Sequence, residues 1–163
     1  MVDIGIDDAV VPDPEWVEYP TLLDLAAPRV LAYQPVTALA EKFETIVSRG
    51  LANSRLRDYF DLWLLSTSRA YEGSEVCAAL SATFGHRGTR LPTEAPPGLS
   101  RAFFDDPAKQ AFWESFLSNR RVDAPADLGD VCGSIVGFIM PAAKAAVAGS
   151  VFDSMWDPSS GWG

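Results

Sequence analysis

One lysine and two aspartates occur close together in the chain, and their types and spacing could bind and orient an anionic group. Lys42 lies at the edge of the apolar stripe of a helix that we expect over residues 35–49. Asp58 and Asp61 lie in the next expected helix, on a face that is otherwise apolar. A carboxylate among apolar side chains costs free energy unless a partner compensates its charge. We therefore expect both acids at a boundary or in a cleft, close to basic side chains.

Basic side chains gather in the same part of the sequence, although the chain as a whole is acidic. Lysine and arginine total 13 against 22 aspartates and glutamates, which gives a formal net charge of −9. Lys42, Arg49, Arg55 and Arg57 form a local positive cluster, and such a cluster indicates a small anionic ligand such as a triphosphate. The lysine would contact the phosphates, and a nearby acid would orient the lysine or position an attacking hydroxyl group.

Ordinary surface charge on a helix is an alternative interpretation of the same residues. Arg55 and Asp58 are three residues apart, and Arg57 and Asp61 are four apart. Pairs at these spacings are common on exposed helices and contribute only about 0.3–0.5 kcal/mol each. Lys42 could extend its stem along the apolar stripe and keep its ammonium group in water. The residues alone leave both interpretations open.

The apolar spacing predicts a mainly α-helical protein with a short N-terminal β segment. Strands are expected at Val2–Ile6, from alternating apolar residues, and at Arg29–Ala32. We divide the chain into residues 1–34, the end of a sheet and a connector, and residues 35–163, a helical domain. The expected helices span residues 35–49, a stretch capped by Asn53 or Ser54 that ends near Ser66, a stretch from Ser74 to Phe84, residues 107–120, and residues 127–148.

Several other residues can be interpreted either as ordinary core or loop residues or as functional ones. Phe112, Trp113 and Phe116 fall on a helical apolar stripe, which predicts core packing rather than base stacking. The stretch GHRGTRLPTEAPPGLS is expected to be a loop because of its glycine and proline content. His86 and Arg87 in this stretch could contact a phosphate or an RNA backbone, or belong to a flexible polar loop.

Composition argues against several other classes of site. The single histidine leaves little room for a zinc site or a histidine-based triad. Cys77 and Cys132 lie in apolar helical patterns, so we interpret them as reduced core thiols. No signal peptide is expected, and the longest apolar run, residues 131–147, contains a proline and a lysine and is short for a membrane span. We expect a cytoplasmic protein without a membrane segment.

Several longer motifs carry a resemblance to a known family. The run AEKFETIVSRGLANSRLRDYFDLWLL resembles the AEK…R…NSR-x-RD-x-x-DL segment of the AbiEii/AbiGii nucleotidyltransferase toxins, which belong to type IV toxin–antitoxin systems. VDIGIDDAVVPDP resembles the strand and turn of that family, and EYPTLLDLAAPRVLAYQPVTALAEK resembles its connector. TFGHRGTRLP, FWESFL and PSSGW also fit. The resemblance covers nearly the whole chain, and its motifs occur in the right order.

The resemblance implies a polymerase-beta-type nucleotidyltransferase of a bacterial abortive-infection system. Such enzymes bind a nucleoside triphosphate with Mg²⁺, transfer a nucleotidyl group to an acceptor such as the 3′ end of tRNA or another RNA, and are controlled by a cognate antitoxin. By resemblance, Lys42 contacts the phosphates, and Asp58 is the acid of the RD-x-x-D motif, with Asp61 as its neighbour. Asp3 matches a strand position that can face the metal, or it is an ordinary solvent-facing acid.

The sequence departs from the family pattern in one respect. The Gly-Ser signature and the Asp-x-Asp strand, which bind metal and triphosphate in such enzymes, are expected before VDIGI and do not occur in these 163 residues. We therefore expect the C-terminal portion of an α+β nucleotidyltransferase fold that is inactive on its own. The alternative is a truncated, noncatalytic remnant or an interaction module that pairs with an antitoxin or with a separate N-terminal half.

Overall fold

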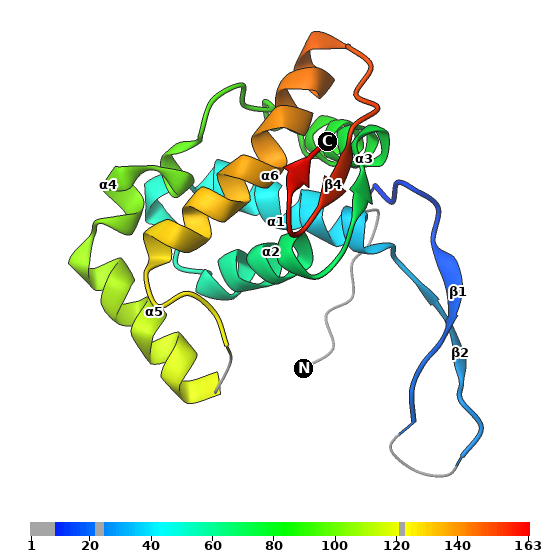
Figure 1. Ribbon diagram of the computed structural model, residues 1–163, viewed down its shortest axis with the longest axis horizontal. Helices are drawn as coiled ribbons and strands as arrows, with labels where there is room; N and C mark the ends of the chain where they lie inside the picture. Colours follow the sequence, from blue (N-terminus) through cyan, green and yellow to red (C-terminus); the bar gives the residue numbers. More distant parts are fainter. Residues whose placement is uncertain (1–8, 22–24, 121–122) are drawn as a thin grey trace.

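The computed structural model describes residues 9–21, 25–120 and 123–163 (Figure 1). The strand expected at Val2–Ile6, with Asp3 in it, lies outside the described residues. The described part is mainly helical with small sheets, as the sequence predicts. Its helices are α1 (Pro35–Arg49), η1 (Gly50–Ala52), α2 (Leu56–Ser68), α3 (Gly73–Arg87), η2 (Pro97–Leu99), α4 (Arg101–Phe104), α5 (Pro107–Arg120) and α6 (Leu128–Ala148). Its strands are β1 (Glu15–Glu18), β2 (Arg29–Ala32), β3 (Tyr71–Glu72), β4 (Met155–Asp157) and β5 (Gly161–Trp162).

Helix α1 has the predicted bounds. Pro35 occupies its first turn, where the missing N–H of proline is not needed. Gly50 follows its last residue with a φ of 52°, a conformation that glycine adopts without strain. One face of α1 is buried against α2 and α3, through Val36, Leu39, Ala40, Phe43 and Ile46.

The start of α2 differs from the prediction. The helix begins at Leu56, and neither Asn53 nor Ser54 caps it. Instead, the Asn53 Oδ1 atom accepts a hydrogen bond from the Arg55 backbone N–H at 2.9 Å. This bond stabilises the turn before the helix, which is a common competing use of an asparagine side chain.

The end of α3 also differs from the prediction. The helix continues through Gly85 to Arg87, and Ser74 lies inside it rather than at its cap. Gly88 adopts the left-handed conformation that ends helices, with a φ of 63°. The stretch expected to be a loop therefore begins three residues later than predicted, and it also contains η2.

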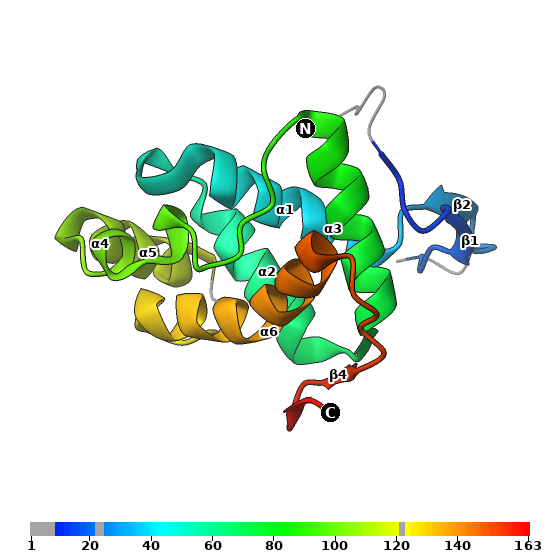
Figure 2. The same cartoon turned by 90° about the horizontal axis from the view of Figure 1, so that it is seen from above.

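Helix α6 is the central helix of the core. It starts at Leu128, one residue later than predicted, because Asp127 caps it and accepts a hydrogen bond from the Gly129 N–H. It continues through Pro141 and ends at Ala148, as predicted. It packs against α2 and α3 (Figure 2). By length and composition α6 could cross a membrane, and 44% of its most apolar window is buried inside the molecule.

The C-terminal segment folds back onto this core. β3, β4 and β5 form a small antiparallel sheet, which lies beside α6 in Figure 1. Trp156 and Trp162 pack against Phe138 of α6, with ring centroids 4.8 Å and 5.8 Å away. The Trp156 Nε1–H donates a hydrogen bond to the Ser66 carbonyl at the end of α2, which ties the C-terminal segment to the helical core.

A second hairpin projects away from the helical body. β1 and β2 pair in antiparallel register, from Glu15 opposite Ala32 to Glu18 opposite Arg29. Figure 1 shows this hairpin standing clear of the helices. Several apolar side chains on and around it are exposed, among them Trp16, Tyr19, Leu31 and Tyr33. A two-stranded hairpin has little stability of its own, so this arrangement is typical of a segment with a further packing partner.

Candidate functional site

Lys42 of α1 lies between two carboxylates of α2. Its Nζ atom is 2.6 Å from Asp61 Oδ2 and 3.3 Å from Asp58 Oδ1. The contact forms because α1 and α2 pack together, with the lysine at the edge of the stripe that α1 buries. The side chain of Lys42 is only 23% exposed. The structure therefore brings together the three residues for which the sequence predicts a shared site.

Two arginines near the start of α2 pair with the same carboxylates. Arg55 Nε is 2.8 Å from Asp58 Oδ2, and Arg57 Nε is 3.6 Å from Asp61 Oδ2. The Asp58 side chain is 4% exposed, so its charge depends on these partners. Its Oδ2 atom makes no well-aligned hydrogen bond, but the nearby Arg55 guanidinium compensates the charge. Three cations thus face two carboxylates, a local positive excess in an acidic chain.

Arg49 is not brought into this cluster. It is the last residue of α1 and is exposed. Seven residues of helix separate it from Lys42, a rise of about 10 Å along the axis. Arg49 shares the helix edge with Lys42, as the sequence indicates, but it belongs to none of the ion pairs of Asp58 and Asp61 and lines neither of the two pockets described below.

A small polar pocket opens beside the lysine. It has a volume of about 160 Å³, and its lining is Glu41, Lys42, Thr45, Arg55, Asp58 and Arg87. Arg87 comes from the end of α3, so three separate helices contribute cationic groups or carboxylates to one small space. A pocket of this size with several cationic groups can accept a compact anion such as a phosphate group.

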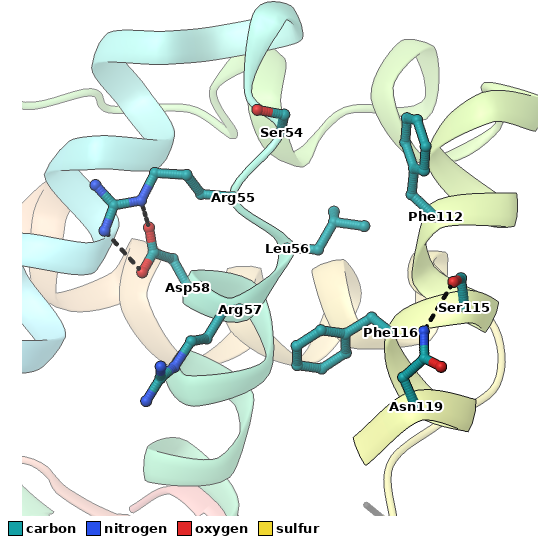
Figure 3. A pocket seen from close by; sticks show the side chains of 9 residues that line it. All are labelled: Ser54, Arg55, Leu56, Arg57, Asp58, Phe112, Ser115, Phe116 and Asn119. Atoms are coloured by element: carbon teal, nitrogen blue, oxygen red, sulfur yellow. Dashed lines mark hydrogen bonds and ion pairs between the residues drawn. The ribbon is translucent and has the colours of Figure 1, made fainter. Parts of the chain in front are cut away.

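A larger pocket lies on the other side of the first turn of α2. It has a volume of about 670 Å³ and lies between α2 and α5 (Figure 3). Figure 3 shows Leu56 and Phe116 pointing into the space between the helices, and the Arg55 and Arg57 side chains on the opposite side of α2. The pocket is lined by Ser54, Arg55, Leu56, Arg57, Asp58, Phe112, Ser115, Phe116 and Asn119. Arg55 and Asp58 line both pockets, which therefore adjoin.

The aromatic residues of α5 divide between the core and this pocket. Trp113 is fully buried and Phe116 is partly buried, with their rings stacked at 5.4 Å. Phe112, which the sequence assigns to the core, is 61% exposed, so that prediction is wrong. The buried stripe of α5 is centred on Trp113, Phe116 and Leu117, and it leaves Phe112 at the rim of the pocket.

Glu44 is a buried acid that the sequence analysis missed. The helical pattern assigns it to the solvent side of α1, but its side chain is only 5% exposed. Its Oε2 accepts a hydrogen bond from Arg87 Nη1 at 2.8 Å, and its Oε1 accepts one from the Thr89 hydroxyl at 2.6 Å. One local signal exists: Glu44 lies four residues after a buried alanine and three before a partly buried valine. Of the two interpretations of Arg87, the flexible loop is wrong, because Arg87 is the last residue of α3 and its bond to Glu44 joins α3 to α1, and the contact with a phosphate or RNA remains a prediction.

The family assignment follows from comparison with known proteins. The family model of the nucleotidyl transferase AbiEii toxin, of type IV toxin–antitoxin systems, matches residues 1–148. The chain belongs to this family. The match covers most of the chain and includes Lys42, Asp58 and Asp61, which confirms the resemblance found in the sequence. Neither the comparison with curated proteins nor that with solved structures gives a match.

Mg²⁺ is the cofactor implied by membership of the AbiEii family, and the described residues do not fit it. In the part of the chain that the structure describes, no group of three or more His, Cys, Asp or Glu side chains could hold a metal ion. Nucleotidyl transfer with metal ions needs several carboxylates around them, whereas Asp58 and Asp61 face lysine and arginine. Asp3, the predicted ligand, lies outside the described residues.

Proposed function

We propose that this AbiEii-family protein transfers a nucleotidyl group from a nucleoside triphosphate to an acceptor such as tRNA or another RNA. The observation that carries the proposal is the position of Lys42, held by two carboxylates beside a small pocket with further cationic groups. Asp58 and Asp61, whose side chains are 4% and 24% exposed, hold the Lys42 ammonium group at the wall of a pocket, where it can meet an anion. Membership of a nucleotidyltransferase family supports the same activity.

In this proposal, Lys42 binds the triphosphate from the polar pocket. Asp58 and Asp61 fix its ammonium group before the substrate arrives, so little conformational entropy is lost on binding. Asp58 also lies where it could orient the acceptor hydroxyl, because it lines both pockets. Arg55 and Arg57 compensate the carboxylates and add positive charge for the phosphates. The substrate-binding role predicted for Arg49 remains a prediction, and Arg49 is not among the residues that line the two pockets.

The proposed setting is the bacterial cytoplasm, where a cognate antitoxin would control the enzyme. Membership of a type IV toxin–antitoxin family supports an antitoxin partner. The candidate membrane helix α6 is part of the core, which supports a protein without a membrane segment.

The test is a nucleotidyl transfer assay with the full-length protein, each labelled nucleoside triphosphate in turn, and total tRNA. Lys42→Ala should abolish transfer and leave the circular dichroism spectrum unchanged, because the lysine lies at the edge of the core. Lys144→Ala is the matched control, since Lys144 is an exposed lysine on α6 outside both pockets. Equal rates for the wild type and for Lys42→Ala would contradict the proposal.

A second candidate is a noncatalytic interaction module, and the exposed β1–β2 hairpin favours it. In this view, residues 1–34 end a nucleotidyltransferase sheet that another polypeptide or chain segment completes, and residues 35–163 form a helical domain. The exposed Trp16, Tyr19 and Leu31 would be covered in the complex. Gel filtration with the antitoxin compares complex formation by the wild type and by Trp16→Ser. Loss of the complex would support the module, and nucleotidyl transfer by the purified protein alone would contradict a noncatalytic role.

A further inference from the structure

We propose that the 670 Å³ pocket between α2 and α5 binds the unpaired terminal base of the acceptor RNA. The inference rests on the proposed function, because it assigns the acceptor to one side of the Asp58 site. Membership of the AbiEii family does not assign a role to this pocket. The exposure of one aromatic ring, the polar groups of the lining and the connection of the pocket to the ionic cluster all fit a base.

Phe112 is the first observation. Its ring is 61% exposed at the rim of the pocket, although it belongs to a helix with a well-packed aromatic stripe. Below it, Phe116 is fixed by ring contacts with Trp113 at 5.4 Å and with Phe60 at 5.6 Å. An exposed ring beside a fixed ring can act as a stacking platform for a base. Burial of the Phe112 ring by a base would remove apolar surface from water as well.

The polar part of the lining is the second observation. Asn119, Ser115 and Ser54 line the pocket, and all three are exposed. The Asn119 amide donates a hydrogen bond to the Ser115 hydroxyl at 3.2 Å, which leaves its carbonyl oxygen directed to other donors. Amide and hydroxyl groups match the hydrogen-bonding edges of a base. An apolar helix of a protein partner would leave these groups without compensation.

The position of the pocket relative to the ionic cluster is the third observation. Arg55 and Asp58 line both this pocket and the polar pocket at Lys42. A nucleotide that straddles the first turn of α2 would place its base beside Phe112 and Phe116, and its backbone towards Arg55 and Arg57 (Figure 3). The guanidinium groups of both arginines are more than half exposed, and they would attract a phosphate backbone to this face of an acidic protein. The terminal hydroxyl would then lie near Asp58.

The test is direct binding of a fluorescein-labelled single-stranded RNA to the full-length protein, measured by fluorescence anisotropy. Phe112→Ala should weaken binding by about tenfold, the usual order of effect for loss of one stacking platform. Phe112→Trp should restore binding, and Phe112→Leu should not, because leucine keeps apolar volume without an aromatic face. Leu64→Ala is the control, since Leu64 is a 44% exposed residue of α2 that does not line the pocket.

Transfer kinetics distinguish the RNA base from other occupants. Phe112→Ala should raise KM for the RNA acceptor and leave KM for the nucleoside triphosphate unchanged. A rise in KM for the triphosphate alone would place the incoming nucleotide in the pocket and overturn the inference. Weakened antitoxin binding with unchanged RNA affinity, or RNA affinity equal to that of Leu64→Ala, would also overturn it. Because anisotropy does not depend on turnover, an active Lys42→Ala variant would refute the proposed function without deciding this inference.

Discussion

Two nearly buried carboxylates, Glu44 of α1 and Asp58 of α2, have different surroundings. Glu44 is 5% exposed and its two oxygens each accept one short hydrogen bond, from Arg87 and from Thr89. Asp58 is 4% exposed and is paired with Lys42, but it lines two pockets. The first carboxylate lies outside the lining of both pockets, and its bond with Arg87 ties α3 to α1. The second belongs to a set that is open to a ligand.

The comparison shows that burial alone does not distinguish a structural acid from a functional one. Both acids are expensive to desolvate, and both are compensated by cations. The difference is the position of the carboxylate: Asp58 lines both pockets, whereas Glu44 lines neither, although its partner Arg87 lines the polar pocket. The Lys42 ammonium has three donors and faces a cavity, so the cluster around it can exchange one anion for another. We therefore expect substitutions at the first cluster to change stability and substitutions at the second to change activity.

The largest expected effect is on activity at Asp58. Asp58→Asn keeps the shape of the side chain and removes the charge that positions Lys42, so nucleotidyl transfer should fall by about 100-fold, the usual cost of misplacing one such group. Glu44→Gln is the matched isosteric change in the other cluster, and it should lower the rate much less, because Glu44 lines neither pocket and touches the polar pocket only through Arg87. Steady-state transfer assays on both variants test the comparison. A similar loss of transfer rate in both variants would contradict the difference between the two acids.

The next effect is on stability at Glu44. Glu44→Ala leaves the Arg87 guanidinium and the Thr89 hydroxyl without their acceptor, and it should lower the free energy of unfolding by about 2 kcal/mol. Arg87 is 33% exposed, so water recovers part of the loss. Urea denaturation measures the change. An unchanged midpoint, with or without a loss of transfer activity, would show that Glu44 does not stabilise the fold.

The core beneath both clusters supplies a test of pH dependence. Burial, with the charge of Asp127 adding to it, raises the pKa of the Cys132 thiol from its ordinary value of 9.0 to about 12. Burial likewise raises the pKa of Tyr71 to about 12. A raised pKa in the folded state means that the unfolded chain loses the proton first. Stability should therefore fall between pH 9 and 12, by at most about 1.4 kcal/mol per pH unit for one group.

Urea denaturation at increasing pH measures this loss. Cys132→Ala removes one of the titrating groups, so its stability should decline less steeply with pH than that of the wild type. Equal slopes for the two proteins would mean that Cys132 is not the source of the pH dependence.

The smallest effect is expected at an exposed ion pair that belongs to neither cluster. Arg101 Nε of α4 lies 3.2 Å from Oδ2 of Asp105, the residue that follows the helix, with side chains 86% and 56% exposed. Pairs this exposed contribute less than about 0.5 kcal/mol. Asp105→Asn should leave both the urea midpoint and the transfer rate within error of the wild type. A larger effect on either would show that exposure is a poor guide to the role of charged pairs in this protein.

The sequence predicts the fold best where local signals agree. α1, α5 and α6 have the predicted bounds to within one residue because proline, aspartate and glycine mark their ends and apolar residues recur at helical spacing. The predicted end of α3 is wrong because two glycines could end the helix: Gly85 stays helical, and Gly88 adopts the left-handed conformation. The exposure of Phe112 also depends on tertiary packing, since helical spacing alone places it next to a buried stripe.

The candidate site was predictable only in part. Lys42, Asp58 and Asp61 could be grouped because charges on apolar faces need partners, and the structure joins them. The bond between Glu44 and Arg87 spans 43 residues, and no local pattern links two such positions. The large pocket between α2 and α5 likewise arises from helices far apart in the chain, so the sequence gives no sign of it.

The central claim is that the charges at Lys42, Asp58 and Asp61 form a nucleotide site, and equilibrium binding tests it most directly. Isothermal titration calorimetry with a nonhydrolysable nucleoside triphosphate would compare the wild type, Lys42→Ala and Glu44→Gln. We predict that the wild type and Glu44→Gln bind with similar affinity and that Lys42→Ala does not bind measurably. Binding of Lys42→Ala with the wild-type dissociation constant would contradict the claim and leave the cluster as a structural ion pair.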